Sequence, residues 1–450
     1  MNAFSIQHRS SSLLFTLSPL SLSLAAALSM GAFTSAQAED STEVFESIEA
    51  TSQQYSESER LAIRRSKREL FFECQQVKTD AARLACYDKV AGNGEIPTFV
   101  TGKKPLDLAK TFQSTISGNP QVVLAEDVVP LGADTVEDAD EVLVVDSAAE
   151  TPQLNGVAKD DQEILAEVGV TQSEIEKYTP LSLAYDLDKN SERGTWTARP
   201  HRPMYLLPIY ANARPNRSPN TPTREEVVSS PNEMRVPELK LQVSVKTKVA
   251  EDLFDTSADL WFGYTQQSHW QVYNEDNSRP FRATDYEPEI ILTQPVAADL
   301  PFGGRLRMLG TGAVHHSNGQ SDPLSRSWNR VYLMAGAEWG RLSVIPRLWT
   351  RVTSDSSGDL DDNPDITDFM GYGDVTFLYD FENRKTLGGT IRYNPDTHKG
   401  ALQLDYIHPL SNNMNGYIQI FQGYGESIID YNHENTGIGI GVVLNDWKGL

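Results

Sequence analysis

The residues best suited to chemistry lie in one polar block, His315–Arg330, in which a serine closely follows two histidines. A serine hydroxyl is a poor nucleophile until a base accepts its proton, so a histidine within hydrogen-bond reach is the minimum requirement. Residues two apart on a strand share a face, which puts His315 beside Ser317 and turns His316 to the opposite side. His315 is therefore the candidate base and Ser317 the candidate nucleophile.

A third group must hold such an imidazole in the correct tautomer and orientation. Asn329 lies twelve residues after Ser317, and an antiparallel return of the chain brings it alongside His315. The residues that share its face are all apolar: Val331, Leu333, Ala335, Ala337 and Trp339. A hydrolytic triad on an apolar outer face implies a lipid substrate. By spacing alone a polar hairpin turn is the other interpretation, because His-x-Ser is frequent by chance.

Alternating strands would position these residues. Segments with a period of two recur at 203–211, 239–249, 257–273, 285–296, 304–317, 328–339, 341–352, 368–381, 386–394, 401–409, 414–424 and 435–445. Their number is even, most are near the roughly 10 residues of a tilted spanning strand, and short turns alternate with longer polar excursions. We therefore predict an all-β fold, a twelve-stranded antiparallel transmembrane β-barrel over 201–450. The alternative is a soluble β-sandwich, which would also alternate.

The N-terminus predicts export. Residues 1–38 have a weakly basic start, an apolar run from Leu13 to about Phe33, and the small residues Ala36 and Ala38 where a signal peptidase cleaves. Serines interrupt the apolar run, and no basic stop-transfer flank follows it, so a signal peptide is favoured over a transmembrane helix. We expect an outer-membrane protein whose N-terminal region is periplasmic.

Two further zones separate the expected signal peptide from the expected barrel. Residues 39–92 are polar and helix-prone and contain both cysteines. In an oxidising compartment, a disulfide between Cys74 and Cys86 is favoured over a metal site or two free thiols. Residues 93–200 are acidic and poor in aromatic side chains, so we expect a largely flexible linker.

The charge distribution supports this division. The 450-residue chain has 62 acidic and 39 basic side chains and a formal net charge of -23, which argues against general nucleic-acid binding. Residues 121–180 hold 15 acidic side chains and two lysines, a local net charge of -13. More than half of the imbalance therefore lies in the expected linker and says little about a substrate.

The block His315–Arg330 resembles the signature of the outer membrane phospholipase A family, which are twelve-stranded barrel serine hydrolases. Further similar motifs are Tyr264-Thr265-Gln266, Tyr286-Glu287-Pro288, Asp361-Asp362-Asn363-Pro364-Asp365-Ile366-Thr367, Met370-Gly371-Tyr372, Gly423-Tyr424-Gly425-Glu426-Ser427 and Asn445-Asp446. The resemblance covers about 201–450 and implies hydrolysis of sn-1 and sn-2 acyl esters of glycerophospholipids and lysophospholipids. The alternative function is a non-enzymatic outer-membrane barrel, porin-like or structural.

The resemblance also implies the roles of single residues. Ser317 matches the family's nucleophile, His315 its general base and Asn329 its orienting third member. Asn stands where many triads have Asp, so the imidazolium gains a dipole rather than a full charge. Gly319 matches the residue whose backbone N–H donates to the oxyanion.

The family is calcium-dependent and is activated by forming a homodimer. The calcium ligands that the resemblance implies are the Ser325 hydroxyl and the Gln320 carbonyl, with the Ser278 carbonyl supplied by a second subunit. Asp362 matches a candidate second calcium position, and Gln266 matches a polar residue at the dimer interface. Family members often have Arg where Gln320 stands, a change that a backbone carbonyl ligand survives.

Overall fold

The computed structural model describes residues 67–92, 105–117, 121–125, 154–188, 194–230, 234–254, 256–353, 361–411 and 414–445. All of them belong to one compact unit, Arg64–Leu450. The expected signal peptide lies outside the described residues, as do 93–104, 118–120, 126–153 and 189–193 of the expected linker 93–200.

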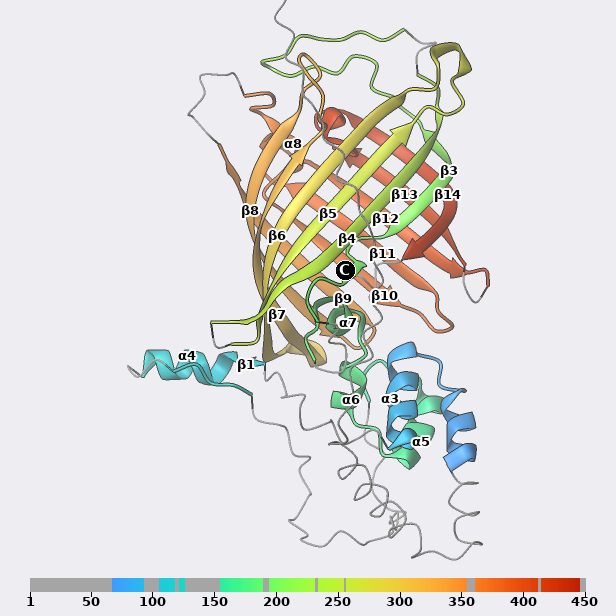
Figure 1. Ribbon diagram of the computed structural model, residues 1–450, viewed down its shortest axis with the longest axis vertical. Helices are drawn as coiled ribbons and strands as arrows, with labels where there is room; N and C mark the ends of the chain where they lie inside the picture. The colour runs from blue at the N-terminus through green and yellow to red at the C-terminus, as the bar shows by residue number, and fades with distance from the viewer. Residues whose placement is uncertain are drawn as a thin grey trace, which may run out of the picture. The chain divides into compact units, whose positions relative to one another are not determined.

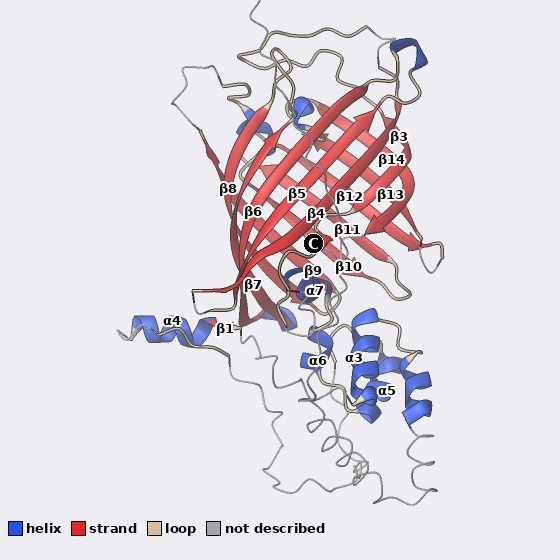
Figure 2. Ribbon diagram, viewed as in Figure 1, coloured by secondary structure: helices blue, strands red, loops and turns tan. Residues whose placement is uncertain are grey.

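Twelve antiparallel strands, β3 to β14, form a closed barrel, shown in Figures 1 and 2. Each strand pairs with its neighbours in sequence, β3 pairs with β14, and the β6–β7 pairing completes the ring. The bounds are β3 Met204–Asn212, β4 Pro237–Leu253, β5 Ala258–Trp270, β6 Phe281–Leu300, β7 Gly304–Ser317, β8 Ser327–Trp339, β9 Leu342–Val352, β10 Gly373–Asp380, β11 Thr386–Asn394, β12 Lys399–Pro409, β13 Asn415–Tyr424 and β14 Glu434–Asn445. The predicted fold class and strand count are confirmed.

The two ends of the barrel differ in their connections. At one end the turns are two to five residues long, such as 340–341 between β8 and β9. At the other end the loops reach 24 residues, over 213–236 between β3 and β4. Outer-membrane barrels place short turns on the periplasmic side and long loops outside. The His315–Arg330 block joins β7 to β8 at the long-loop end.

The wall of the barrel is apolar outside and polar inside, the reverse of a soluble protein. Exposed outward side chains include Phe262, Ile290, Leu333, Leu348 and Ile438. Charged inward side chains are buried, among them Glu238, Lys240, Lys246, Lys248 and Glu289. An apolar outer band with a polar interior is the arrangement that a lipid bilayer requires of a barrel.

One short helix occupies the lumen at the short-turn end. Thr179 caps α7 (Pro180–Tyr185), and Leu181 and Tyr185 belong to the same buried apolar cluster as the inward residues of the strands. Asp186, which ends the helix in a left-handed conformation, is fully buried and pairs with Arg199 of β2 (Ala198–Pro200) and Lys248. These ion pairs hold α7 and β2, which precede β3 in the chain, inside the barrel.

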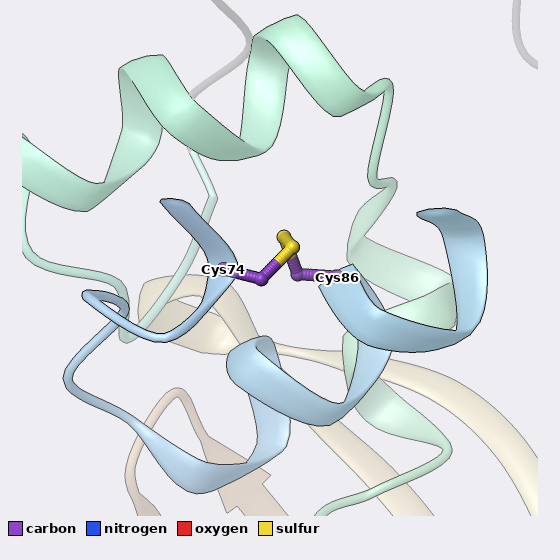
Figure 3. Close-up of a disulfide and its surroundings, with 2 residues drawn as sticks. All are labelled: Cys74 and Cys86. Atoms are coloured by element: carbon purple, nitrogen blue, oxygen red, sulfur yellow. A yellow bond between two sulfur atoms is a disulfide. The ribbon is translucent and has the colours of Figure 1, made fainter. Parts of the chain in front are cut away.

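A second, smaller apolar core includes the disulfide drawn in Figure 3 and holds the helical segment together. A helix over 67–74 packs with α3 (Asp80–Ala91), α5 (Lys159–Val168) and α6 (Gln172–Glu176). The expected disulfide between Cys74 and Cys86 is present, with a Cα–Cα distance of 5.6 Å and both side chains fully buried. Residues 154–188 supply three helices to these cores, so this part of the expected linker is ordered. The acidic residues of this stretch indicated a linker, although apolar residues within it, among them Leu165, Ile175 and Leu181, are buried.

The remaining elements are short. β1 (Leu106–Asp107) is followed directly by α4 (Leu108–Ile116). α8 (Ile366–Met370) lies in the loop between β9 and β10. In the described part of the chain, 3₁₀ turns occur at Glu275–Asn277, Pro301–Gly303 and Ile428–Asp430. Among the described residues, no helix combines the length and apolar character that crossing a membrane would take.

Candidate active site

Strand register brings two of the expected triad members together. His315 of β7 and Asn329 of β8 are direct cross-strand partners, and the His315 Nδ1 lies 2.8 Å from the Asn329 Oδ1. Both side chains are exposed on the outer face, whereas the adjacent His316 and Trp328 point inward and are buried. Because an amide oxygen only accepts, the His315 Nδ1 carries the proton and its Nε2 is left as a base.

Ser317 lies two residues further along β7 on the same outer face as His315. It pairs with Tyr286 of β6 on one side and with Ser327 of β8 on the other. In the described part of the chain, no hydrogen bond joins Ser317 to His315. The structure therefore joins His315 to Asn329 directly and places Ser317 beside them through the pleat of the strand.

His316 is excluded as the base for Ser317. Its Nε2 lies 3.3 Å from the Asp285 Oδ2, and its Nδ1 accepts a hydrogen bond of 3.3 Å from the Trp328 indole. Both ring nitrogens therefore face partners inside the barrel. Only His315 has a ring nitrogen available on the outer face that carries Ser317.

The loop between β7 and β8 is organised by Asn318, which the sequence analysis did not single out. Its side-chain oxygen accepts from the backbone N–H groups of Gln320 and Arg326, at 3.3 and 3.0 Å, and its amide donates to the Leu324 carbonyl at 2.8 Å. Gly319 follows with φ +62° and is exposed, and a Cβ there would lie 3.1 Å from the Tyr286 ring. A left-handed glycine leaves the backbone beside Ser317 accessible.

The expected calcium ligands fall into two groups. Ser325 and Gln320 share this loop, and the Ser325 hydroxyl donates to the Asp362 carboxylate at 2.7 Å. Ser278 lies in a different loop, after the 3₁₀ turn between β5 and β6, and no hydrogen bond links it to Ser325 or Gln320 in the described chain. The described residues contain no cluster of three or more His, Cys, Asp or Glu side chains able to hold a metal.

The oxygen donors present nevertheless suit calcium. Ser325 and Gln320 supply hydroxyl and carbonyl oxygens, which are hard ligands, next to a carboxylate. Asp362 also pairs with the guanidinium of Arg224 from the loop between β3 and β4. Arg224 was missed by sequence reasoning because 138 residues separate it from Asp362. A cation at Asp362 would therefore compete with this arginine.

Gln266 lies on the outer face of β5, half-buried, in register with Tyr286 of β6. Its side-chain oxygen accepts a hydrogen bond of 3.0 Å from the Tyr264 hydroxyl. Because Tyr286 in turn pairs with Ser317, the three residues form one row across β5, β6 and β7. A polar amide in an otherwise apolar wall thus lies two strands from the candidate nucleophile.

A family model described as phospholipase A1 matches residues 181–444, more than half of the chain and the whole barrel apart from Asn445. The chain belongs to the phospholipase A1 family. The matched region begins in α7, so the family model includes the helix inside the lumen as well as the strands. The barrel and the members of this family that resemble the chain indicate a phospholipase of the bacterial outer membrane.

Curated members of the phospholipase A1 family differ in how much of the chain they match. The chain is 47% identical over 389 residues to a Neisseria meningitidis protein named "Putative phospholipase A1", covering 85% of this chain and 92% of that protein. It is 40% identical over 213 residues to Escherichia coli phospholipase A1, covering 47% and 71%. Because 389 aligned residues exceed the length of 201–450, the Neisseria likeness continues into the N-terminal region.

Solved structures of family members cover the barrel. Outer membrane phospholipase A from Escherichia coli aligns with a TM-score of 0.51 and 32% identity, over 60% of this chain and 99% of that chain. The Salmonella typhi outer membrane phospholipase dimer with bound calcium has a TM-score of 0.51 and 32% identity, over 59% and 97%. At most 60% of this chain is aligned in either case, so the rest of the chain has no counterpart in these two solved structures.

Proposed function

We propose that this phospholipase is a calcium-dependent homodimer that hydrolyses acyl esters with Ser317, His315 and Asn329 on the lipid-facing wall. The hydrogen bond between His315 and Asn329 carries the proposal, because it leaves the His315 Nε2 as a base on the face of Ser317. Lipid that diffuses along an apolar wall reaches this face, whereas it does not reach the charged lumen.

In this mechanism the His315 Nε2 accepts the Ser317 hydroxyl proton as the oxygen attacks the ester carbonyl. Asn329 holds the imidazole through Nδ1 and supports the imidazolium with its carbonyl dipole. The same imidazolium then gives its proton to the leaving glycerol oxygen, and a water molecule activated by the imidazole releases the fatty acid. The backbone N–H of Gly319 donates to the oxyanion, which its exposure and left-handed conformation permit.

Calcium would be held by the Ser325 hydroxyl and the Gln320 carbonyl of one subunit and by the Ser278 carbonyl of the other. When bound, the ion would supply positive charge that stabilises the negative charge of the oxyanion. Ser325, Gln320 and Ser278 lie in long loops at the same end of the barrel, which supports a shared site. The solved Salmonella typhi dimer with bound calcium is consistent with this arrangement.

The homodimer would form through the outer face around Gln266. A buried amide that finds its partner in a second subunit stabilises association in lipid, where no water competes for the hydrogen bond. Asp362 is the proposed second calcium position, where the ion would have to compete with Arg224. Requiring two subunits for a complete site would keep the monomer from degrading the membrane that holds it.

The proposed function includes a range of acyl-ester substrates and an orientation of the barrel in the membrane. Both sn-1 and sn-2 acyl esters, and those of lysophospholipids, would be substrates, because the triad lies on an open wall and lines neither of the main cavities of the described chain. The short-turn end and the N-terminal region would face the periplasm. Phospholipids with a labelled acyl chain at one position test the first point, and protease protection in whole cells tests the second.

Fatty-acid release from mixed micelles, with calcium or with chelator, tests the proposed function directly. We expect Ser317→Ala to abolish calcium-dependent release, and the matched control Ser327→Ala, which changes the cross-strand neighbour, to retain it. Cross-linking in the same micelles should detect the dimer only when calcium is present. Equal release from wild type and Ser317→Ala would overturn the enzymatic mechanism and favour a non-enzymatic barrel.

A further inference from the structure

Residues 105–117 and 121–125 form a small unit beside the short-turn end of the barrel. β1 pairs in parallel with the last part of β6, at Val296 and Ala297, beyond the point where β5 stops pairing. After α4 the chain returns, and backbone hydrogen bonds of 2.8 Å join 105–107 to 123–125. The Asp107 side chain caps α4 by accepting from the Lys110 N–H at 2.9 Å. Local hydrogen bonds, rather than a core, therefore order this unit.

α4 carries an apolar stripe that is not packed into the described protein. Leu108, Phe112 and Ile116 are four residues apart and share one face, and Phe112 and Ile116 are 68% and 71% exposed. Val122 and Leu124 of the returning segment 121–125 are also exposed. The other face of the helix is polar, with Lys110, Gln113 and Ser114. No residue of α4 is buried.

The position and charge of this unit indicate what covers the stripe. The unit is attached to β6, whose outward side chains, such as Ile290, are exposed to lipid, and it lies where that strand leaves the bilayer. Residues 96–125 contain Lys103, Lys104 and Lys110 against the single acid Asp107, a net charge of +2 in a chain of -23. Short amphipathic helices with lysines and a bulky apolar face lie in the plane of anionic membranes.

We propose that α4 and residues 121–125 form an interfacial anchor on the lipid leaflet at the short-turn end of the barrel. Phe112 and Ile116 insert between acyl chains, while Lys110 stays at the level of the phosphate groups. The occupant of the stripe is thus a phospholipid surface, independent of the substrate at Ser317. The anchor ties the chain between the helical segment and the barrel to the membrane.

Fluorescence of the full chain in vesicles tests the anchor. Phe112→Cys and Lys110→Cys place a thiol on nearly opposite sides of α4, because two residues turn a helix by about 200°. Both native cysteines form the disulfide, so a polarity-sensitive thiol label reacts with the new cysteine alone. Ile438→Cys on the outer face of β14 is the lipid-exposed reference. A Ser317→Ala background protects vesicles of phosphatidylethanolamine and phosphatidylglycerol from hydrolysis.

Quenching by brominated phospholipid and by aqueous iodide distinguishes the outcomes. We expect brominated lipid to quench the label at position 112 several-fold more than at 110, and nearly as much as at 438, with iodide showing the opposite order. Strong iodide quenching at 112 would overturn the proposal, because the stripe would face water. Protection of 112 from both quenchers would also overturn it, because protein would cover the stripe. Heat-modifiable migration on a gel confirms that each variant retains its barrel.

Discussion

Two adjacent histidines show how differently the two faces of the barrel wall use the same side chain. His315 is exposed on the outer face with one ring nitrogen bonded to Asn329 and the other available. His316 is buried in the lumen, with both nitrogens bonded to Asp285 and Trp328. The pleat of β7 therefore gives the proposed base an available ring nitrogen and leaves its neighbour with two lumenal partners.

The lumenal and outer faces differ in the same way over the whole barrel wall. In the lumen, Glu289 accepts from His201 at 2.6 Å and from the Tyr332 hydroxyl at 2.8 Å, and Arg202 bonds Glu287 through both of its amino groups. Such partnered charges hold the strands and are not free to react. On the outer face, polar groups are few, so those that occur at 315, 317 and 329 are the ones available to a lipid substrate.

The two histidines give the largest expected difference. His315→Ala should reduce fatty-acid release at least about 10²–10⁴-fold, the usual contribution of a general base, because Ser317 loses its base. His316→Ala should retain most of the activity and instead lower the urea concentration at which the barrel unfolds, because Asp285 and Trp328 lose a partner. The measurements are initial rates in calcium-containing micelles and urea unfolding in vesicles. Loss of activity in His316→Ala and retention in His315→Ala would reverse the assignment.

Removing a lumenal charge should cost stability rather than catalysis. Glu289→Ala leaves Arg202 and His201 with fewer acidic partners, and removing one member of a buried ion pair costs about 3–5 kcal/mol in the free energy of unfolding. Glu289→Gln keeps the shape and some of the hydrogen bonds and should cost less. Urea unfolding in vesicles measures both, and unchanged stability in Glu289→Ala would show that the lumenal network does not hold the strands.

A matched pair on β9 should separate packing in the lumen from packing against lipid. Ile345→Ala opens a cavity inside the barrel and should cost about 2–5 kcal/mol, the transfer term plus a cavity term. Leu348→Ala on the outer face should cost only the transfer term, about 2 kcal/mol, because lipid fills the space. Equal losses of unfolding free energy in the two variants would contradict the different packing of the two faces.

Asn329 should affect activity less than its partner His315 does. Asn329→Ala removes the hydrogen bond to His315 but leaves the base, so we expect fatty-acid release to fall about 10–100-fold. Asn329→Asp keeps an acceptor for Nδ1–H and should retain more activity than the alanine variant. Initial rates at saturating calcium measure both. A loss in Asn329→Asp as large as that in Asn329→Ala would argue against an orienting role.

Much of the barrel could be predicted because the alternation of apolar and polar residues along each strand is a local pattern. Period-2 alternation located all twelve strands, and the expected block 304–317 coincides with β7. The outward direction of Asn329 followed from the apolar residues that share its face. Both inferences depend only on neighbours along one strand, which the sequence contains directly.

The contacts that were missed join distant parts of the chain. The ion pair between Arg224 and Asp362 and the insertion of α7 among the strands need loops to meet. The helices over 154–188 lie in a stretch whose acidic composition indicated a linker. Their apolar residues, such as Leu165, Ile175 and Leu181, become buried only by packing with α3 and with the lumen.

The amino-acid sequence by itself determined the alternation of the wall, the pairing of Cys74 with Cys86, and the shared face of His315 and Ser317. These follow from backbone geometry and from the chemistry of single residue types. The expected antiparallel return already placed Asn329 alongside His315. Only the tertiary structure decided that the two side chains bond each other, that Arg224 pairs with Asp362, and that α7 fills one end of the lumen. Those outcomes depend on strand register and loop closure, which no local pattern specifies.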